Sequence, residues 1–126
     1  MFDRLDSRSP VPLYEQIATR VRVAVASGEL SPGDSLPSVR QLAGSARVNP
    51  ATVVQAYREL ESDGFVEMRQ GAGTFVKEVL PDKRSDERRK QARVLVQRMM
   101  GEAARLGIDT EEIVAAIRHE LEVGPE

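Results

Sequence analysis

The stretch that spans residues 36–60 does most to limit what this chain can fold into. Ser38 is a suitable N-cap for a short helix, and the apolar spacing that follows breaks off near Arg47. Asn49 and Pro50 then predict a second helix start, because Asn caps helix N-termini and Pro suits the first helical position. Two short helices around a tight turn predict a helix-turn-helix, which places the N-terminal face of its second helix in the major groove of DNA.

Helical spacing separates two faces of this motif. The inward face is apolar and is expected to form the core through Val39, Leu42, Ala43, Ala46, Val53, Ala56, Tyr57 and Leu60. The outward face of the second helix carries small or polar side chains, namely Ala51, Gln55, Arg58 and Ser62, with Asn49 and Thr52 at the start of the helix. This outward face is the candidate surface for reading DNA.

The elements around the motif are expected to complete an N-terminal domain of residues 1–79. Apolar residues that recur every four positions predict a helix that begins near Leu13 and ends at Gly28. The turn-rich segment that follows it is expected to pair as one short strand with a later hairpin. That hairpin is predicted at 65–76, where two strands flank a glycine-rich turn. A hairpin beside a helix-turn-helix is a wing.

Residues 80–126 are expected to form a helical region that pairs two copies of the chain. We interpret 80–85 as a linker, followed by a helix that ends at Gly107. Asp109 and Glu112 have the spacing of a capping box for a last helix. Two helices this apolar cannot bury all of their apolar surface against each other, so a second copy is the expected cover. The residues predicted for this dimerisation interface are Val96, Met99, Met100, Ala103, Leu106, Ile113, Ile117 and Leu121.

Composition narrows the class of protein. A chain of 126 residues has room for one compact domain and a small appendage, which excludes a large catalytic domain. It has no cysteine, secretory signal or membrane-spanning run, so we expect a cytoplasmic protein without disulfides that does not bind membranes. The net charge of -2 hides an uneven distribution, because the last twenty residues hold six acidic residues and one basic residue. A locally positive surface that binds DNA is compatible with this distribution.

Five motifs stand in unbroken order between residues 10 and 77, at 12–17, 28–43, 48–53, 57–60 and 71–76. Together they resemble the winged-helix head of GntR-type bacterial transcription regulators. The short region after the head is similar to that of the YtrA subfamily, in which two C-terminal helices serve dimerisation. The patterns and the resemblance predict a chain that is mainly α with a small β-hairpin, namely a winged helix-turn-helix domain followed by two C-terminal α-helices.

The resemblance also implies which residues contact DNA. Arg40 would reach a base edge or a phosphate from the first helix of the motif, and the wing tip would approach the minor groove. The residues predicted to bind DNA are Ser38, Arg40, Asn49, Ala51, Thr52, Gln55, Arg69, Gln70, Gly71 and Gly73. Each has an alternative interpretation without DNA. Arg40 would then form a surface salt bridge, Asn49 would serve only as an N-cap, and the glycines would only shape a turn.

We expect a sequence-specific regulator, and more narrowly a repressor, that binds a pseudo-palindromic operator in double-stranded DNA as a homodimer. The resemblance implies that it controls its own operon. The alternative is a winged-helix module that binds proteins, which requires exposed aromatic and leucine side chains on the second helix. An enzyme is not expected, because no acid–base pair, nucleophile set or phosphate loop emerges. His119 is the only histidine, so no metal or cofactor is expected. An unidentified small-molecule effector is a further partner that regulators of this kind can take.

Overall fold

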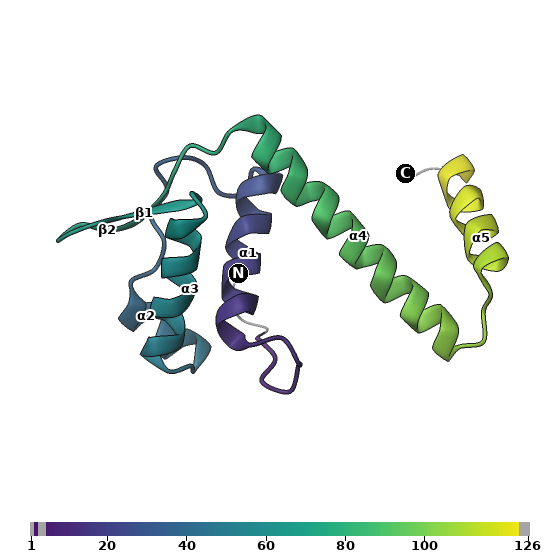
Figure 1. Cartoon of the computed structure of the whole chain (residues 1–126), viewed down its shortest axis with the longest axis horizontal. Coiled ribbons are helices and arrows are strands. Elements are labelled where there is room, and N and C mark those ends of the chain that lie inside the picture. Colours follow the sequence, from purple (N-terminus) through teal and green to yellow (C-terminus); the bar gives the residue numbers. More distant parts are fainter. Residues whose placement is uncertain (1, 3–4, 124–126) are drawn as a thin grey trace. The chain divides into compact units, whose positions relative to one another are not determined.

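The computed structural model describes residue 2 and residues 5–123, which form five helices and one hairpin (Figure 1). In chain order the elements are α1 (Leu13–Ser27), α2 (Val39–Ala46), α3 (Pro50–Ser62), β1 (Val66–Arg69), β2 (Gly73–Val76), α4 (Pro81–Arg105) and α5 (Thr110–Val123). The predicted fold class is confirmed, since a winged helix-turn-helix is followed by two α-helices. The chain divides into two compact units, Met1–Arg88 and Arg89–Glu126. The first unit therefore extends beyond residue 79 and includes the first turns of α4.

Helix α3 lies at the centre of the first unit. It contacts α1, α2 and β1, and its side chains Val53, Ala56, Tyr57 and Leu60 are fully buried. Burial of a large aliphatic or aromatic side chain stabilises the fold by about 1.5–3 kcal/mol, so these residues fix the position of the helix. Packing of the inward side chains of α3 therefore fixes the orientation of its outward face.

Both helices of the motif begin as their sequences predict. The Ser38 hydroxyl accepts a hydrogen bond from the Gln41 backbone N–H, while the Gln41 side chain accepts one from the Ser38 N–H, so α2 starts with a capping box. The Asn49 side chain accepts a hydrogen bond of 2.9 Å from the Ala51 N–H at the start of α3. Pro50 occupies the first turn, where its missing N–H costs nothing.

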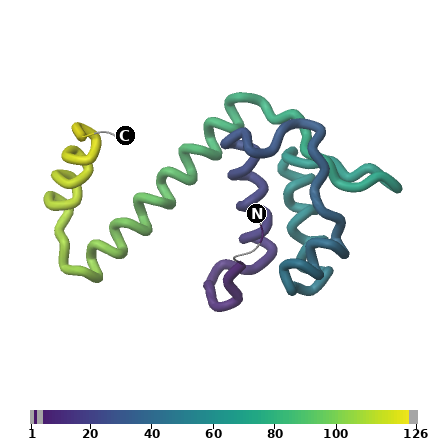
Figure 2. Tube along the Cα trace, turned by 180° about the vertical axis from the view of Figure 1, so that it is seen from behind, coloured from purple at the N-terminus to yellow at the C-terminus, as the bar shows by residue number. Residues whose placement is uncertain are grey.

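The wing is an antiparallel pair in which Val66 faces Val76 and Arg69 faces Gly73. The segment before α2 runs along the outer edge of β2, as the trace seen from behind shows (Figure 2). Gly33 and Leu36 donate backbone hydrogen bonds of 2.8 Å to the carbonyls of Val76 and Thr74. The predicted pairing of this segment with the hairpin is confirmed, and it ties the wing to the rest of the first unit.

The linker predicted at 80–85 is wrong, because α4 begins at Pro81. Proline is favoured in the first turn of a helix, and Asp82 beside it complements the positive end of the helix dipole. The sequence hides this start because the first turns carry almost no apolar stripe. Glu87 on this part of α4 is buried, and the Arg88 guanidinium donates a 3.1 Å hydrogen bond to the Ala26 carbonyl near the end of α1.

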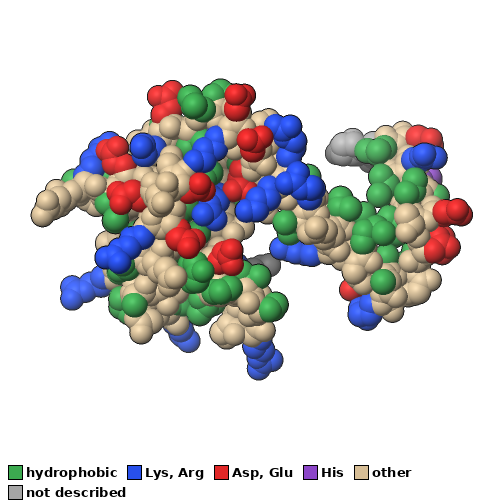
Figure 3. All heavy atoms as spheres, in the orientation of Figure 1, with side chains coloured by type: hydrophobic (Ala, Val, Ile, Leu, Met, Phe, Trp, Pro, Cys, Tyr) green, Lys and Arg blue, Asp and Glu red, His purple; other side chains and the backbone are tan. Residues whose placement is uncertain are grey.

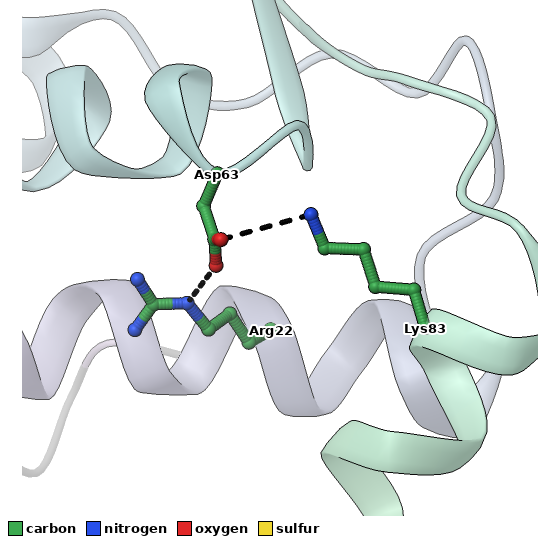
Figure 4. A network of polar contacts seen from close by, with 3 residues as sticks. All are labelled: Arg22, Asp63 and Lys83. Carbon is green, nitrogen blue, oxygen red and sulfur yellow. Dashed lines mark hydrogen bonds and ion pairs between the residues drawn. The ribbon is translucent and has the colours of Figure 1, made fainter.

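A charged cluster, Arg22, Asp63 and Lys83, joins three elements of the first unit (Figure 4). Asp63 caps the C-terminus of α3 and accepts a 3.2 Å hydrogen bond from the Arg22 side chain of α1. Lys83 of α4 lies 3.6 Å from the other Asp63 oxygen. Both cations also face the buried Phe65 ring, at 4.9 Å for Lys83 and 6.0 Å for Arg22. The cluster therefore fixes the C-terminal end of α3 against its neighbours.

The second unit holds the remainder of α4 and all of α5. Asp109 and Glu112 form the predicted capping box, since each side chain accepts a hydrogen bond from the backbone N–H of the other residue. No residue of α5 is buried. Of the predicted interface residues, the exposed ones are Val96, Leu106, Ile117 and Leu121, and the half-buried ones are Met99, Met100 and Ile113. Ala103 differs from them because it is 3% exposed and is already covered within one chain.

Candidate nucleic-acid interface

Two open hollows mark the outward surface of α2 and α3. One follows α3 and is lined by Ala51, Val54, Gln55, Arg58, Glu59 and Ser62. The other lies where α2 meets the start of α3 and is lined by Val39, Arg40, Ala43, Gly44, Val48 and Pro50. Lys and Arg side chains stand out on this side of the molecule, below the wing (Figure 3). The structure thus gathers Arg40, Ala51 and Gln55 on one surface that two helices form.

Arg40 is an exposed side chain at the start of α2. Within the described part of the chain its guanidinium makes no hydrogen bond, ion pair or ring contact. The alternative of an intramolecular surface salt bridge is therefore not realised at this residue. All donors of the guanidinium stay available, and two of them have the geometry to bind the O6 and N7 atoms of a guanine.

Ser38 and Asn49 are hydrogen-bonded to the local backbone, and Thr52 is partly buried. The Ser38 and Asn49 oxygens each accept a hydrogen bond that starts a helix. Their hydroxyl hydrogen and amide N–H groups remain as donors, so capping and an outside contact do not exclude each other. Thr52 is only half-exposed. The exposed start of α3 adds the positive end of a helix dipole, which favours a phosphate oxygen.

Arg58 belongs to the same surface, although it was not among the residues predicted to bind DNA. It is exposed, lines the α3 hollow beside Gln55, and has no partner among residues 2 and 5–123. The sequence could have indicated a role in DNA binding for Arg58, because this residue follows Ala51 and Gln55 at helical spacing on the face that points away from the core. A charged side chain here raises the positive potential of the surface.

The wing tip places Gln70, Gly71 and Gly73 in exposed positions. Gly71 has φ 79 and Gly73 has φ 122, and both values favour glycine over other residues. These glycines therefore serve the turn first. No described cluster of histidine and acidic residues has the arrangement of a metal site.

Arg69 is not free in the way that Arg40 is. Its guanidinium donates a 2.5 Å hydrogen bond to Glu67 and lies 4.5 Å from the centre of the Phe75 ring. The hydrogen bond to Arg69, followed by its charge, lowers the pKa of the Glu67 carboxyl. Both partners are about half exposed, so the ion pair is weak and a phosphate can compete for the guanidinium.

Comparison with known proteins identifies the family. The family model described as "Bacterial regulatory proteins, gntR family" matches residues 13–76. The chain is similar to the HTH-type transcriptional repressor YtrA of Bacillus subtilis, with 45% identity over 75 residues that cover 60% of this chain and 58% of YtrA. It is also similar to the uncharacterized HTH-type transcriptional regulator YhcF of the same species, with 37% identity over 93% of this chain and 96% of that protein.

Solved structures agree with the sequence comparison. YtrA from Sulfolobus acidocaldarius, a GntR-family transcription factor, aligns over 80% of this chain and 99% of its own, with a TM-score of 0.59 and 36% identity. The AraR DNA-binding domain in complex with its operator ORE1 aligns over 60% of this chain and 93% of its own, with a TM-score of 0.51 and 28% identity. These relatives are regulators, in agreement with the expectation that the chain is not an enzyme. The chain belongs to the GntR family of bacterial regulatory proteins and is similar to YtrA.

Proposed function

We propose that this chain is a cytoplasmic repressor that binds a pseudo-palindromic operator as a homodimer and controls its own operon. The observation that carries the proposal is the outward surface of α2 and α3, where Arg40 is exposed and has no partner within the described chain. A free guanidinium at this position suits readout of a guanine in the major groove. The small side chains around it leave room for the edges of the bases.

The relatives support a DNA role for the first unit. The AraR structure holds a DNA-binding domain on its operator, and that domain aligns with 60% of this chain. YtrA of Bacillus subtilis is named as a repressor, and its similarity covers 60% of this chain. A shared fold alone does not establish a function, so the proposal depends on the free cations of the surface as well.

The surface also argues against a module that binds proteins. The large hydrophobic side chains exposed in the described chain lie before α2 or after α3, and none of them belongs to the helix-turn-helix. Interfaces between proteins are enriched in exposed aromatic and methionine anchors at their centre. The polar outward face of α3 does not offer such an anchor.

The apolar surface of the second unit supports the proposed homodimer. Leu121 is 75% exposed and Leu106 is 57% exposed, and hydrophobic side chains gather over α5 in the space-filling view (Figure 3). Exposed apolar patches of this kind mark an interface, and a second copy is the partner always present. A two-fold dimer presents two recognition helices to two half-sites of inverted sequence, which is the reason to expect a pseudo-palindrome.

Selection of bound fragments from a random DNA pool tests the proposal directly. We expect enrichment of an inverted repeat, and affinity for it that falls steeply with salt because cations contact phosphates. Arg40→Ala is then compared with the unchanged protein on the selected site and on random DNA. Loss of a bidentate guanine contact costs about 1–3 kcal/mol of discrimination between them.

Arg98→Ala is the matched control, because Arg98 is also exposed and lies on α4 outside the proposed surface. It should leave the ratio of specific to random binding unchanged. A pool that shows no enrichment contradicts the DNA-binding role as a whole. An Arg40→Ala protein that keeps the original ratio contradicts only the role of Arg40 in reading bases.

A further inference from the structure

The turn between α2 and α3 holds a residue in an unfavourable backbone conformation. Arg47 has φ 57 and ψ 48, the left-handed region, and it is the only non-glycine residue with a positive φ among residues 2 and 5–123. Residues with a Cβ atom rarely adopt this conformation, and Gly or Asn accommodates it more easily. Arginine is therefore an unfavourable choice for the backbone at this position.

The conformation itself is required by the tight turn. The Arg47 and Val48 N–H groups both donate to the Ala43 carbonyl, which closes the last turn of α2. Asn49 follows Val48 as the N-cap of α3, so only three residues, 47–49, connect the helices. A residue at this position has to turn left-handed for the two helices to keep their packing.

Nothing within the described chain compensates for the choice of arginine. The Arg47 side chain is exposed, and in the part of the chain that the structure describes it makes no hydrogen bond, ion pair or ring contact. Residues that keep a strained backbone without a compensating contact inside the protein are concentrated at functional sites. We therefore expect the contact that compensates for the strain at Arg47 to be made with another molecule.

We propose that Arg47 contacts a DNA phosphate and so sets the position of α3 on the duplex. The inference rests on the proposed DNA-binding function and adds a residue to it. Arg47 lies two residues before the N-cap of α3, beside a helix start whose dipole also favours an anion. Under the proposed function, the polyanion that binds this surface is DNA. Arg47 is solvated and lies at the edge of the surface, where the phosphates of the DNA backbone are the groups within its reach.

A phosphate contact leaves a different signature from a base contact. Phosphate contacts fix the position of the protein and carry no sequence information of their own, so their loss weakens binding to all sequences by a similar factor. Each lost contact also makes the dependence of log affinity on log salt shallower by about 0.9. Loss of a base contact instead changes the ratio between the selected site and random DNA.

The test compares Arg47→Asn with Arg47→Lys in the full chain. Asn removes the charge and tolerates the left-handed backbone, whereas Lys keeps both the charge and the strain. Binding to the selected operator and to random DNA of the same length is measured at several salt concentrations, and melting temperature is measured by circular dichroism. Arg47→Asn should bind both DNAs about tenfold more weakly, with a slope that is shallower by about 0.9 per protomer and a melting temperature no lower than that of the unchanged protein.

The expected result for Arg47→Lys is binding close to that of the unchanged protein. The inference is overturned if Arg47→Asn keeps the original affinity and slope, or if Lys loses as much affinity as Asn. It is also overturned if only operator binding falls, because Arg47 would then read bases. Arg47→Gly, which fits the turn without strain, replaces the Asn variant if that protein melts at a lower temperature. Absence of DNA binding by the unchanged protein would refute the proposed function itself and is seen before any variant is compared.

Discussion

At the scale of single residues, the hydroxyl of Tyr57 connects α3 to the segment that leads into α2. Its ring is fully buried in α3, and its hydroxyl donates a 2.6 Å hydrogen bond to the Pro37 carbonyl just before α2. Desolvation by burial raises the pKa of the Tyr57 hydroxyl above its ordinary value. The same side chain therefore fills the core and fastens the segment that leads into α2.

We expect Tyr57→Phe to lower the free energy of unfolding by about 1–2 kcal/mol, because the Pro37 carbonyl loses its partner. The raised pKa adds a dependence on pH. Stability from the neutral hydroxyl is fully present below about pH 10, the ordinary tyrosine value, and is lost as the pH rises toward the raised value. Urea unfolding of the unchanged protein and the Tyr57→Phe variant at pH values from about 7 to 11 should show the difference between them shrinking above about pH 10. An unchanged difference over this range would contradict the assignment.

At the scale of single residues, the arginines of the candidate site differ in whether they have a partner within the described chain. Arg40, Arg47 and Arg58 keep their donors free within the described chain, whereas Arg69 is paired with Glu67. The sequence could indicate which arginines lie outside the core, because helical spacing gives the face of each residue. It could not indicate that Arg69 lies over the Phe75 ring, because that contact depends on the register of the hairpin.

The cluster of Arg22, Asp63 and Lys83 acts at the scale of elements. Its side chains come from α1, the end of α3 and the start of α4. The Arg22 side chain is 14% exposed and the Lys83 side chain is 40% exposed. Removal of the shared carboxylate would leave Arg22 largely buried beside Phe65 without its anion.

Asp63→Asn is expected to lower the free energy of unfolding by about 1–2 kcal/mol, since a mostly buried charge loses its partner. Lys83→Met should cost less than about 0.5 kcal/mol, because exposed ion pairs contribute little and the methionine stem keeps the packing on Phe65. Thermal unfolding of both variants at low and high salt compares the two contributions. A larger loss for Lys83→Met would show that the connection to α4, and not the Arg22 pair, is the important contact.

Prediction of the elements succeeded where short-range signals are strong. The caps at Ser38 and Asn49, the glycine turn of the wing and the capping box after Gly107 all appear in the structure. The start of α4 was missed because a polar helix without an apolar stripe has no period to detect. Its first turns are held by contacts with α1 and the end of α3, which lie far away in the sequence.

The proposed assembly of two copies concerns the whole molecule. The last helix presents Ile113, Ile117 and Leu121 at helical spacing, and none of these side chains is buried within one chain. If a second copy covers this surface, a charge placed in it has to separate the two chains or remain buried without a partner.

Ile117→Glu should therefore convert the dimer to a monomer at micromolar concentration and weaken operator binding, because the two half-sites are no longer bound as one unit. Light scattering and operator titration measure the two effects. Ala115→Glu is the control, since Ala115 lies on the opposite face of α5 and is exposed. Dimers of unchanged stability in the Ile117→Glu protein would contradict the proposed interface.

The sequence by itself determined the helices of the head, the wing, the residues of the core and the face of α3 that points outward. Those features follow from caps, turn residues and the spacing of apolar side chains, all of which act over a few residues. Only the tertiary structure decided the left-handed Arg47, the position of Arg69 over the Phe75 ring and the cluster at Asp63. Each of these depends on the distance and orientation at which separate elements pack, and local preferences do not carry that information.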